Sequence, residues 1–215
     1  MTTDFSRARL NMVNAQIATN GIHSAALIDA YKALPRENFV GDDLRPYVYM
    51  DEEVAGAKGW LLEPMTEARM VQEAVRGSGA TGLFYGAGNL PAAVMLAQFL
   101  KTVTLVEADA SAASTARTRL ADAGISNITV VADAGQGGAY DVVFIPGAVS
   151  RITPEMTAQL AVGGALICVL RETRRAQGRI VVARKSHDGA LDITTGADAS
   201  TPYLAGFEPA ADFVF

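Results

Sequence analysis

The chain contains few of the residues that build metal and disulfide sites. Among its 215 residues there are one cysteine, Cys168, and two histidines, His23 and His187. A single cysteine excludes an internal disulfide and argues against a cysteine-based zinc site. His187 lies in the sequence Ser-His-Asp-Gly, which is typical of a hairpin turn, and three adjacent letters do not make a Ser-His-Asp triad. We therefore predict no metal site, and little room is left for histidine chemistry.

The chain also lacks a basic excess and a long apolar segment. It has 18 Lys and Arg residues against 23 Asp and Glu residues, a net charge of −5 and a pI near 5.0. Nucleic-acid binders present a basic face, so this charge argues against a nucleic-acid partner. No stretch approaches the roughly 18 uninterrupted apolar residues of a membrane-spanning helix, and the first residues lack the pattern of a secretory signal. We expect a soluble cytoplasmic protein without a membrane partner.

The composition that remains is that of a compact globular chain, with 50% hydrophobic and 19% charged residues. Its pattern changes near residue 80. Before that point apolar positions recur at helical spacing, with Ser24 placed to cap one helix and Pro64 to begin another. After it, short apolar runs alternate with helical stretches. We predict a helical N-terminal extension over residues 1–79 and a Rossmann-like core over residues 80–215, packed as one unit.

The apolar runs after residue 80 are typical of a doubly wound parallel sheet. A last pair of runs frames the turn at residues 186–189 and predicts an antiparallel hairpin. The expected parallel strands are residues 82–85, 103–107, 128–131, 141–145 and 165–170, and the hairpin strands are residues 179–184 and 190–194. The predicted fold is therefore α/β: a Rossmann-like, doubly wound, mostly parallel seven-stranded sheet with an antiparallel edge and a helical N-terminal extension.

In such a sheet, ligands bind beyond the carboxyl ends of the strands. Residues 86–88 read Gly-Ala-Gly after the first strand, and glycines there let the backbone approach a ligand. Glu107 ends the second strand, where a carboxylate can accept hydrogen bonds from ribose hydroxyls, and Asp133 follows the third, where it could accept from an adenine amino group. An ordinary turn would explain each position singly, but the three together favour a nucleotide site. The candidate cofactor-binding residues are Gly86, Ala87, Gly88, Glu107, Ala108, Asp133 and Ala134.

Several segments resemble the protein-L-isoaspartate O-methyltransferase family, which belongs to the class I S-adenosylmethionine-dependent methyltransferases. The most specific is Pro-Arg-Glu-x-Phe-Val at residues 35–40. Tyr49 and Asp51 are similar to the Ala-Tyr-x-Asp segment that follows it in the family, and Glu107 and Asp133 fall in family order. The similarity extends from residue 12 to residue 170.

The resemblance implies a protein-L-isoaspartate (D-aspartate) O-methyltransferase that acts in protein repair. Its cofactor would be S-adenosylmethionine, with S-adenosylhomocysteine as the product, and its partner would be a carboxylate on a protein or peptide. An ionised carboxylate is already a nucleophile, so no catalytic residue is assigned. The acceptor would be covered by the end of the extension, where the candidate substrate-binding residues are Trp60, Leu62, Glu63 and Pro64.

The chain departs from the family pattern in both motifs. In the first cofactor loop, Phe84 stands in place of an acid and Leu90 in place of a third glycine. In residues 58–64 the family pattern Gly-x-x-x-Ser-x-Pro keeps its proline, but Leu62 replaces the serine that lies at the reacting carboxyl. These changes leave a second interpretation open, a family member without isoaspartyl activity that binds a nucleoside or a partner. Side chains of Phe84 or Leu90 filling the cofactor pocket would favour that interpretation.

Three further features bear on the site. Trp60 is the only tryptophan, and its position is as consistent with a core anchor as with a pocket wall. Cys168 lies in an apolar strand and is expected to be a buried, unreactive thiol. Arg171, Arg174 and Arg175 follow the fifth strand; such a run usually marks a solvated loop, with attraction of an anionic substrate as the alternative.

Overall fold

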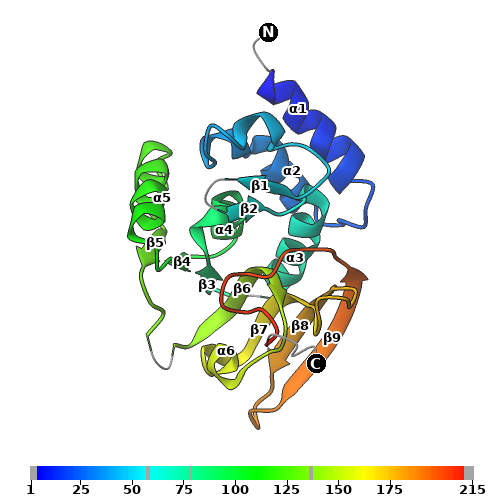
Figure 1. Cartoon of the computed structure of the whole chain (residues 1–215), viewed down its shortest axis with the longest axis vertical. Coiled ribbons are helices and arrows are strands. Elements are labelled where there is room, and N and C mark those ends of the chain that lie inside the picture. The colour runs from blue at the N-terminus through cyan, green and yellow to red at the C-terminus, as the bar shows by residue number, and fades with distance from the viewer. Residues whose placement is uncertain (1–3, 57–58, 78, 136–137, 211–215) are drawn as a thin grey trace, which may run out of the picture.

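A seven-stranded sheet lies at the centre of the computed structural model, which describes residues 4–56, 59–77, 79–135 and 138–210 (Figure 1). Its strands are β3 (Thr81–Tyr85), β4 (Thr102–Val106), β5 (Ile128–Val131), β6 (Tyr140–Val149), β7 (Leu160–Leu170), β8 (Arg179–Lys185) and β9 (Leu191–Asp198). They lie in the order β5-β4-β3-β6-β7-β8-β9. Pairing is parallel from β5 to β7 and antiparallel from β7 to β9. The predicted fold class is confirmed, including its antiparallel edge.

Strands β6 and β7 extend further than the apolar runs predict. β6 continues through Pro146 and Gly147 to Val149, with a shift in its register against β7 between Phe144 and Ala148. β7 begins at Leu160, well before the predicted start at residue 165. Proline and glycine usually end a strand in a sequence-based reading. Here β7 pairs with β6 on both sides of Pro146 and Gly147, and β6 therefore continues through them as one strand.

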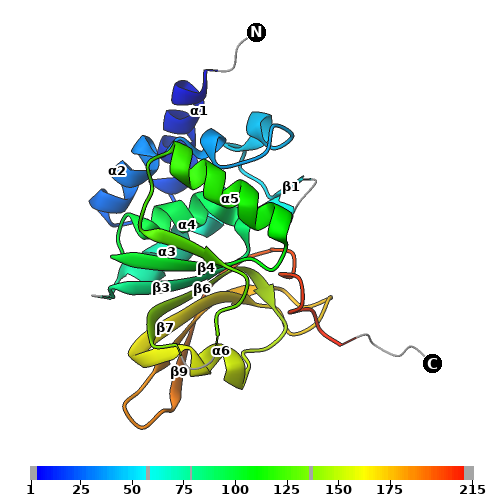
Figure 2. The ribbon, with the colours of Figure 1, turned by 90° about the vertical axis from the view of Figure 1, so that its left-hand side faces the viewer.

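Side chains alternate between the two faces of the sheet, and each face is covered differently. On one face, Phe84, Phe144 and Ile167 share a hydrophobic cluster with residues of five helices. On the other face, Leu83, Val143 and Cys168 pack with the short helix α6. The helices from residue 64 onward that pack against the sheet are α3 (Pro64–Val75), α4 (Leu90–Ala97), α5 (Ala110–Asp122) and α6 (Pro154–Ala158). Figure 2 shows α4 and α5 together on one side of the sheet. Cys168 is buried, and burial raises the pKa of its thiol to about 12, as expected for an unreactive cysteine.

The N-terminal extension up to residue 63 packs onto the face of the sheet that α3, α4 and α5 cover. Its elements are α1 (Phe5–Met12), a π-helical turn (Val13–Ile17), α2 (Ala25–Ala33) and the two-stranded hairpin of β1 (Val54–Gly56) and β2 (Gly59–Leu61). The cap of α2 is confirmed, because the Ser24 side chain accepts a hydrogen bond from the N–H of Leu27 at 3.2 Å. Pro64 begins α3, as predicted. One hydrophobic cluster contains residues of both the extension and the sheet. The division of the chain into two parts at residue 80 stays a prediction.

The topology places a crevice beyond the carboxyl ends of the central strands. From β3 the chain runs outward through β4 to β5, and it then returns to β6 on the other side of β3. Strand order reverses at this point, and the carboxyl ends of β3 and β6 are therefore where a ligand is expected. Within the described residues, no helix is long and apolar enough to cross a membrane. Nor do these residues form a group of three or more His, Cys, Asp or Glu able to hold a metal ion.

Candidate functional site

The loop after β3 turns sharply at Gly86. Its φ of +83° is a conformation that side chains other than glycine rarely adopt, and its N–H donates to the carbonyl of Val106 at 2.8 Å. Residues Ala87–Asn89 form one 3₁₀ turn that leads directly into α4. A Cβ on Gly86 would lie 3.3 Å from Leu204 Cδ1, so a distant segment of the chain already lies against this loop. The loop is therefore held by both its neighbouring strand and the C-terminal region.

Glu107 is fixed at the end of β4 with its carboxylate toward this loop. Its Oε2 accepts a hydrogen bond from the N–H of Ala87 at 2.8 Å, and its Oε1 accepts one from the N–H of Asp109 at 2.9 Å. An ionised carboxylate offers about four acceptor positions, so two remain for a ligand. These bonds make Glu107 a pre-oriented acceptor for a pair of hydroxyl groups.

A cavity of about 490 Å³ connects Glu107 to the hairpin of the extension. Its wall includes most of the candidate cofactor residues after β3 and β4, namely Gly86, Gly88, Glu107 and Ala108, together with Asn89 and Trp60. Trp60 is a pocket wall and also packs against the core, because its ring lies where a Cβ on Gly147 would be, 2.8 Å from Cζ2. We call this space the ribose-side cavity.

A second cavity, of about 520 Å³, adjoins it at the end of β5. Asp133 and Ala134 line it, so it contains two of the three remaining candidate cofactor residues. The Oδ1 of Asp133 accepts a hydrogen bond from the N–H of Gly135 at 2.6 Å, and Oδ2 is left for a ligand. Tyr85, Val106 and Phe207 line both cavities. Candidate residues that follow three different strands therefore line two adjoining cavities.

The chain's C-terminal strap, residues 201–208, forms the outer wall of both cavities. It is drawn in red across the end of β6 in Figure 1. The N–H of Leu204 donates to the carbonyl of Ala148 at 3.0 Å, and the N–H of Ser150 donates to the carbonyl of Phe207 at 2.9 Å. The Phe207 ring meets Tyr85 edge-on, with centroids 6.0 Å apart. Sequence reasoning missed the strap because its contacts join residues more than fifty positions apart, and no motif marks residues 201–208.

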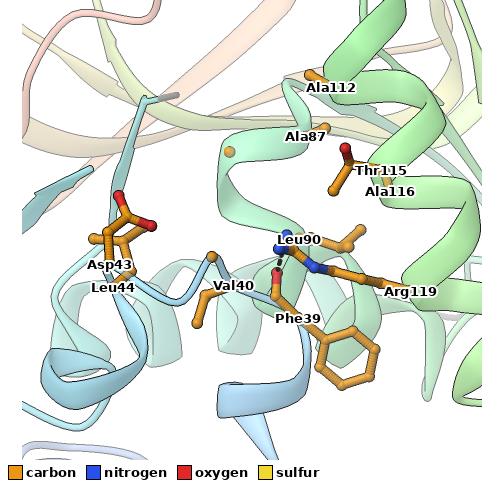
Figure 3. A pocket seen from close by; sticks show the side chains of 12 residues that line it. Phe39, Val40, Asp43, Leu44, Ala87, Leu90, Ala112, Thr115, Ala116 and Arg119 are labelled. Atoms are coloured by element: carbon orange, nitrogen blue, oxygen red, sulfur yellow. Dashed lines mark hydrogen bonds between the residues drawn. The ribbon is translucent and has the colours of Figure 1, made fainter. Parts of the chain in front are cut away.

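A third, smaller hollow lies on the opposite side of the cofactor loop (Figure 3). It has a volume of about 260 Å³ and separates the loop from α5 and from residues 39–44 of the extension. Apolar groups form most of its wall, and Arg119 at its edge donates to the carbonyl of Phe39 at 3.5 Å. Ala87, a candidate cofactor residue, faces this hollow and not the ribose-side cavity. Its backbone N–H, bonded to Glu107, is what it contributes to the site.

Neither departure in the cofactor motif fills the two cavities. Phe84 is fully buried on the helical face, where its ring stacks on Phe144 with centroids 5.3 Å apart and an angle of 7° between the planes. Leu90 is buried at the start of α4 and borders only the apolar hollow among the cavities described here. Substitution at these two positions therefore leaves the space for a cofactor open.

Asn89 joins the cofactor loop to the acceptor hairpin, which we define as residues 54–56 and 59–64. Its side-chain oxygen accepts a hydrogen bond from the N–H of Leu62 at 2.7 Å, and its nitrogen donates to the carbonyl of Trp60 at 3.0 Å. Leu62 and Pro64 are buried and do not line the ribose-side cavity, whereas Trp60 does. Lys58, the first residue of the substrate motif, lies outside the described residues. Sequence reasoning also missed Asn89, because its role follows only from its hydrogen bonds to the hairpin.

Replacing Asn89 with alanine should loosen this junction. The change leaves a buried N–H and a partly buried carbonyl without partners, and we expect the free energy of unfolding to fall by about 2 kcal/mol. Urea unfolding followed by Trp60 fluorescence measures the effect. Asn11→Ala, at an exposed position on α1, is the matched control and should change stability by less than about 0.5 kcal/mol. Equal stabilities of the two variants would contradict the role given to Asn89.

A switch point surrounded by a glycine loop, a fixed acid and an aromatic strap is the binding site of an enzyme that uses a nucleoside cofactor. The chain belongs to the family described as protein-L-isoaspartate (D-aspartate) O-methyltransferase, whose sequence model matches residues 8–204. It is therefore an S-adenosylmethionine-dependent O-methyltransferase. The resemblance noted from the motifs is confirmed.

Individual relatives agree with this assignment. A protein-L-isoaspartate O-methyltransferase from Methylorubrum extorquens (strain PA1) is 32% identical over 190 residues, which cover 82% of this chain and 83% of the relative. A solved protein-L-isoaspartate O-methyltransferase shares the fold with a TM-score of 0.77 at 20% identity, covering 94% of this chain and 67% of that chain. A Plasmodium falciparum protein assigned to the same family, solved in complex with S-adenosyl-L-homocysteine, has a TM-score of 0.71 at 14% identity and covers 93% and 97% of the two chains.

Proposed function

We propose that the protein transfers the methyl group of S-adenosylmethionine to the carboxylate of an isoaspartyl residue in damaged proteins or peptides. The observation that carries this proposal is the position of Glu107, a pre-oriented acceptor in a cavity that reaches the acceptor hairpin. Family membership supports the substrate class. Location in the cytoplasm stays a prediction from the sequence.

The residues around the two cavities fit the cofactor in kind and in order. Glu107 would hold the ribose hydroxyls, the free oxygen of Asp133 would accept from the adenine amino group, and Gly86 and Gly88 would border the amino-acid portion. Ala108 and Ala134 are small enough to leave room beside the nucleoside. Phe207, which lines both cavities, provides an aromatic face where the adenosine would pass from one to the other.

The chain's contribution to the reaction is alignment and exclusion of water. When bound, the cofactor supplies a methyl group that its sulfonium has already activated. The acceptor carboxylate is already a nucleophile and needs no general base. The strap and the Trp60 ring close the cavity on two sides, and Asn89 holds the acceptor hairpin at a fixed distance from the cofactor loop.

Two measurements test this function. Transfer of tritium from labelled S-adenosylmethionine to an isoaspartyl peptide is expected, with no transfer to the same peptide containing normal aspartate. Titration calorimetry with S-adenosylhomocysteine is expected to show binding. Binding without transfer would overturn isoaspartyl methylation and favour the non-catalytic interpretation, and a flat isotherm would overturn the cofactor site itself.

A further inference from the structure

Three charged side chains gather beside the acceptor hairpin without a role in the arrangement described so far. In the hairpin, Val54 pairs with Leu61 and Ala55 with Trp60, and Glu53 comes directly before the first of these pairs. Glu63 follows Leu62 directly. Arg171 follows β7 directly, and its charge and that of Glu63 both act on the carboxyl of Glu53. We call Glu53, Glu63 and Arg171 the charged trio.

Arg171 lies against Tyr203, a wall residue of the ribose-side cavity, and its own loop holds its side chain. Its Nε donates to the carbonyl of Ala176 at 3.1 Å and its Nη2 donates to the carbonyl of Arg174, which leaves Nη1 to meet a ligand. Its guanidinium carbon lies 5.4 Å from the centre of the Tyr203 ring, and the Tyr203 hydroxyl donates to the carbonyl of Arg171 at 2.7 Å. Tyr203 itself lines the cavity. In the described part of the chain Arg171 forms no ion pair, so its charge is available.

The order of the strands separates the two ends of the cavity. Glu107 is at the β4 end, the cofactor loop follows β3 in the middle, and Tyr203 lies at the β6 and β7 end, beside Ala148. If Glu107 holds the ribose, the end that remains for the acceptor is the one bordered by Trp60 and Tyr203. Leu62, buried there, offers no hydroxyl, and its N–H is already bonded to Asn89. Arg171 is a cation in contact with a wall residue at this end, through the ring of Tyr203.

We propose that Arg171 determines specificity for an anionic acceptor by pairing with the acceptor carboxylate, and that Glu53 weakens this pairing when it is ionised. The proposal rests on the proposed methyl transfer. It assigns to Arg171 the recognition that the missing serine hydroxyl cannot provide. The side chains of Arg174 and Arg175, in the same loop, are exposed and have no part in it.

The state of Glu53 makes the pairing depend on pH. The side chain is partly buried, and its Oε1 is buried without a hydrogen-bond partner among the described residues. Burial and the charge of Glu63 raise its pKa to about 7, while Arg171 opposes the rise. Below that pH the trio is neutral, and above it the trio carries a net negative charge that repels an anion. The acceptor carboxylate, with an ordinary pKa of about 4, stays ionised throughout.

Trp60 gives a direct binding measurement, since it is the only tryptophan and it lines the cavity. We would titrate the protein, saturated with S-adenosylhomocysteine, with a tryptophan-free isoaspartyl peptide and with the matching peptide whose side-chain carboxylate is an amide. Arg171→Gln should raise the Kd for the anionic peptide about tenfold or more, because a charge-assisted hydrogen bond is lost. It should leave the Kd for the amide peptide unchanged. Arg171→Lys should restore part of the affinity, and Arg175→Gln is the control.

The same variants separate binding from chemistry. In the methylation assay Arg171→Gln should raise KM and leave kcat within about twofold of the wild type. Between pH 6 and pH 8 the wild-type Kd for the anionic peptide should rise at least about threefold, and Glu53→Gln should bind tightly at both values. Circular dichroism and thermal unfolding check that each variant is folded.

The outcomes distinguish this inference from the proposed function. If the wild type binds the peptide but transfers no methyl group, isoaspartyl methylation fails, while the Kd values still decide the role of Arg171. An unchanged Kd for the anionic peptide in folded Arg171→Gln, or an equal loss for both peptides, would overturn the role of Arg171. A pH-independent wild-type Kd would overturn the part assigned to Glu53.

Discussion

Replacing Glu107 with alanine is expected to raise the Kd for S-adenosylhomocysteine at least about 100-fold, because two hydroxyl groups lose a charged acceptor worth about 1.5–3 kcal/mol each. The substitution also frees the N–H groups of Ala87 and Asp109 that the carboxylate now holds. The lost ribose contact and the less ordered loop both weaken cofactor binding. Methyl transfer should fall in proportion at cofactor concentrations below the new Kd.

Glu107→Gln separates the two contributions to this loss. The amide oxygen can still accept one of the two backbone N–H groups, but the amide nitrogen is a donor and cannot accept the other. We expect an affinity between those of the wild type and the alanine variant. Glu73→Gln on α3 removes an acid that pairs with Arg76 at 3.1 Å on the surface, and it serves as the charge-matched control.

Calorimetry gives the Kd values, and thermal unfolding gives an independent measure. A ligand present at 100 times its Kd stabilises the folded protein by about 2.7 kcal/mol, so S-adenosylhomocysteine should raise the Tm of the wild type and of Glu73→Gln. The same concentration should leave the Tm of Glu107→Ala nearly unchanged. Binding by Glu107→Ala within about threefold of the wild type would show that the ribose is held elsewhere.

The parts of the site that the sequence predicts are those in which local pattern and function coincide. Gly86 needs a positive φ, and Glu107 ends an apolar strand one crossover later, so both follow from positions along the chain. The structure places Asp133 beside the adjoining cavity by the same logic. Parallel strands of one sheet bring their carboxyl ends together whatever the intervening helices contain.

The rest of the site depends on contacts that local pattern does not encode. The strap reaches Ala148 and Ser150 from residues more than fifty positions later, and nothing in its sequence specifies that partner. In the sequence, Asn89 is typical of an ordinary turn residue, and its role follows only from its hydrogen bonds to the acceptor hairpin. β6 passes through Pro146 and Gly147 because β7 pairs with it on both sides of them, and Gly147 makes room for the Trp60 ring. In each case a tertiary partner decides the structure.

The Pro-Arg-Glu-x-Phe-Val segment identifies the family, and its arginine forms the most deeply buried ion pair of the described residues. Arg36 Nη1 lies 2.6 Å from Glu67 Oε1 on α3, and both side chains are fully inaccessible to solvent. The Tyr31 hydroxyl donates to the same oxygen at 3.1 Å, and Arg36 Nε donates to the carbonyl of Val48 at 3.2 Å. The pair therefore fastens the part of the extension before α3, which carries the acceptor hairpin, to α3.

Breaking this pair should be the most destabilising change proposed for the chain. Arg36→Met leaves a buried carboxylate without its cation, and Glu67→Gln leaves a buried guanidinium without its anion; each should lower the free energy of unfolding by about 3–5 kcal/mol. Arg36→Met combined with Glu67→Leu removes both charges and should recover most of that loss, because two desolvated ions are replaced by apolar groups. Urea unfolding of the singles and the double gives the coupling energy. Additive losses would mean that the two charges act independently and that their pairing does not fasten this part of the extension to α3.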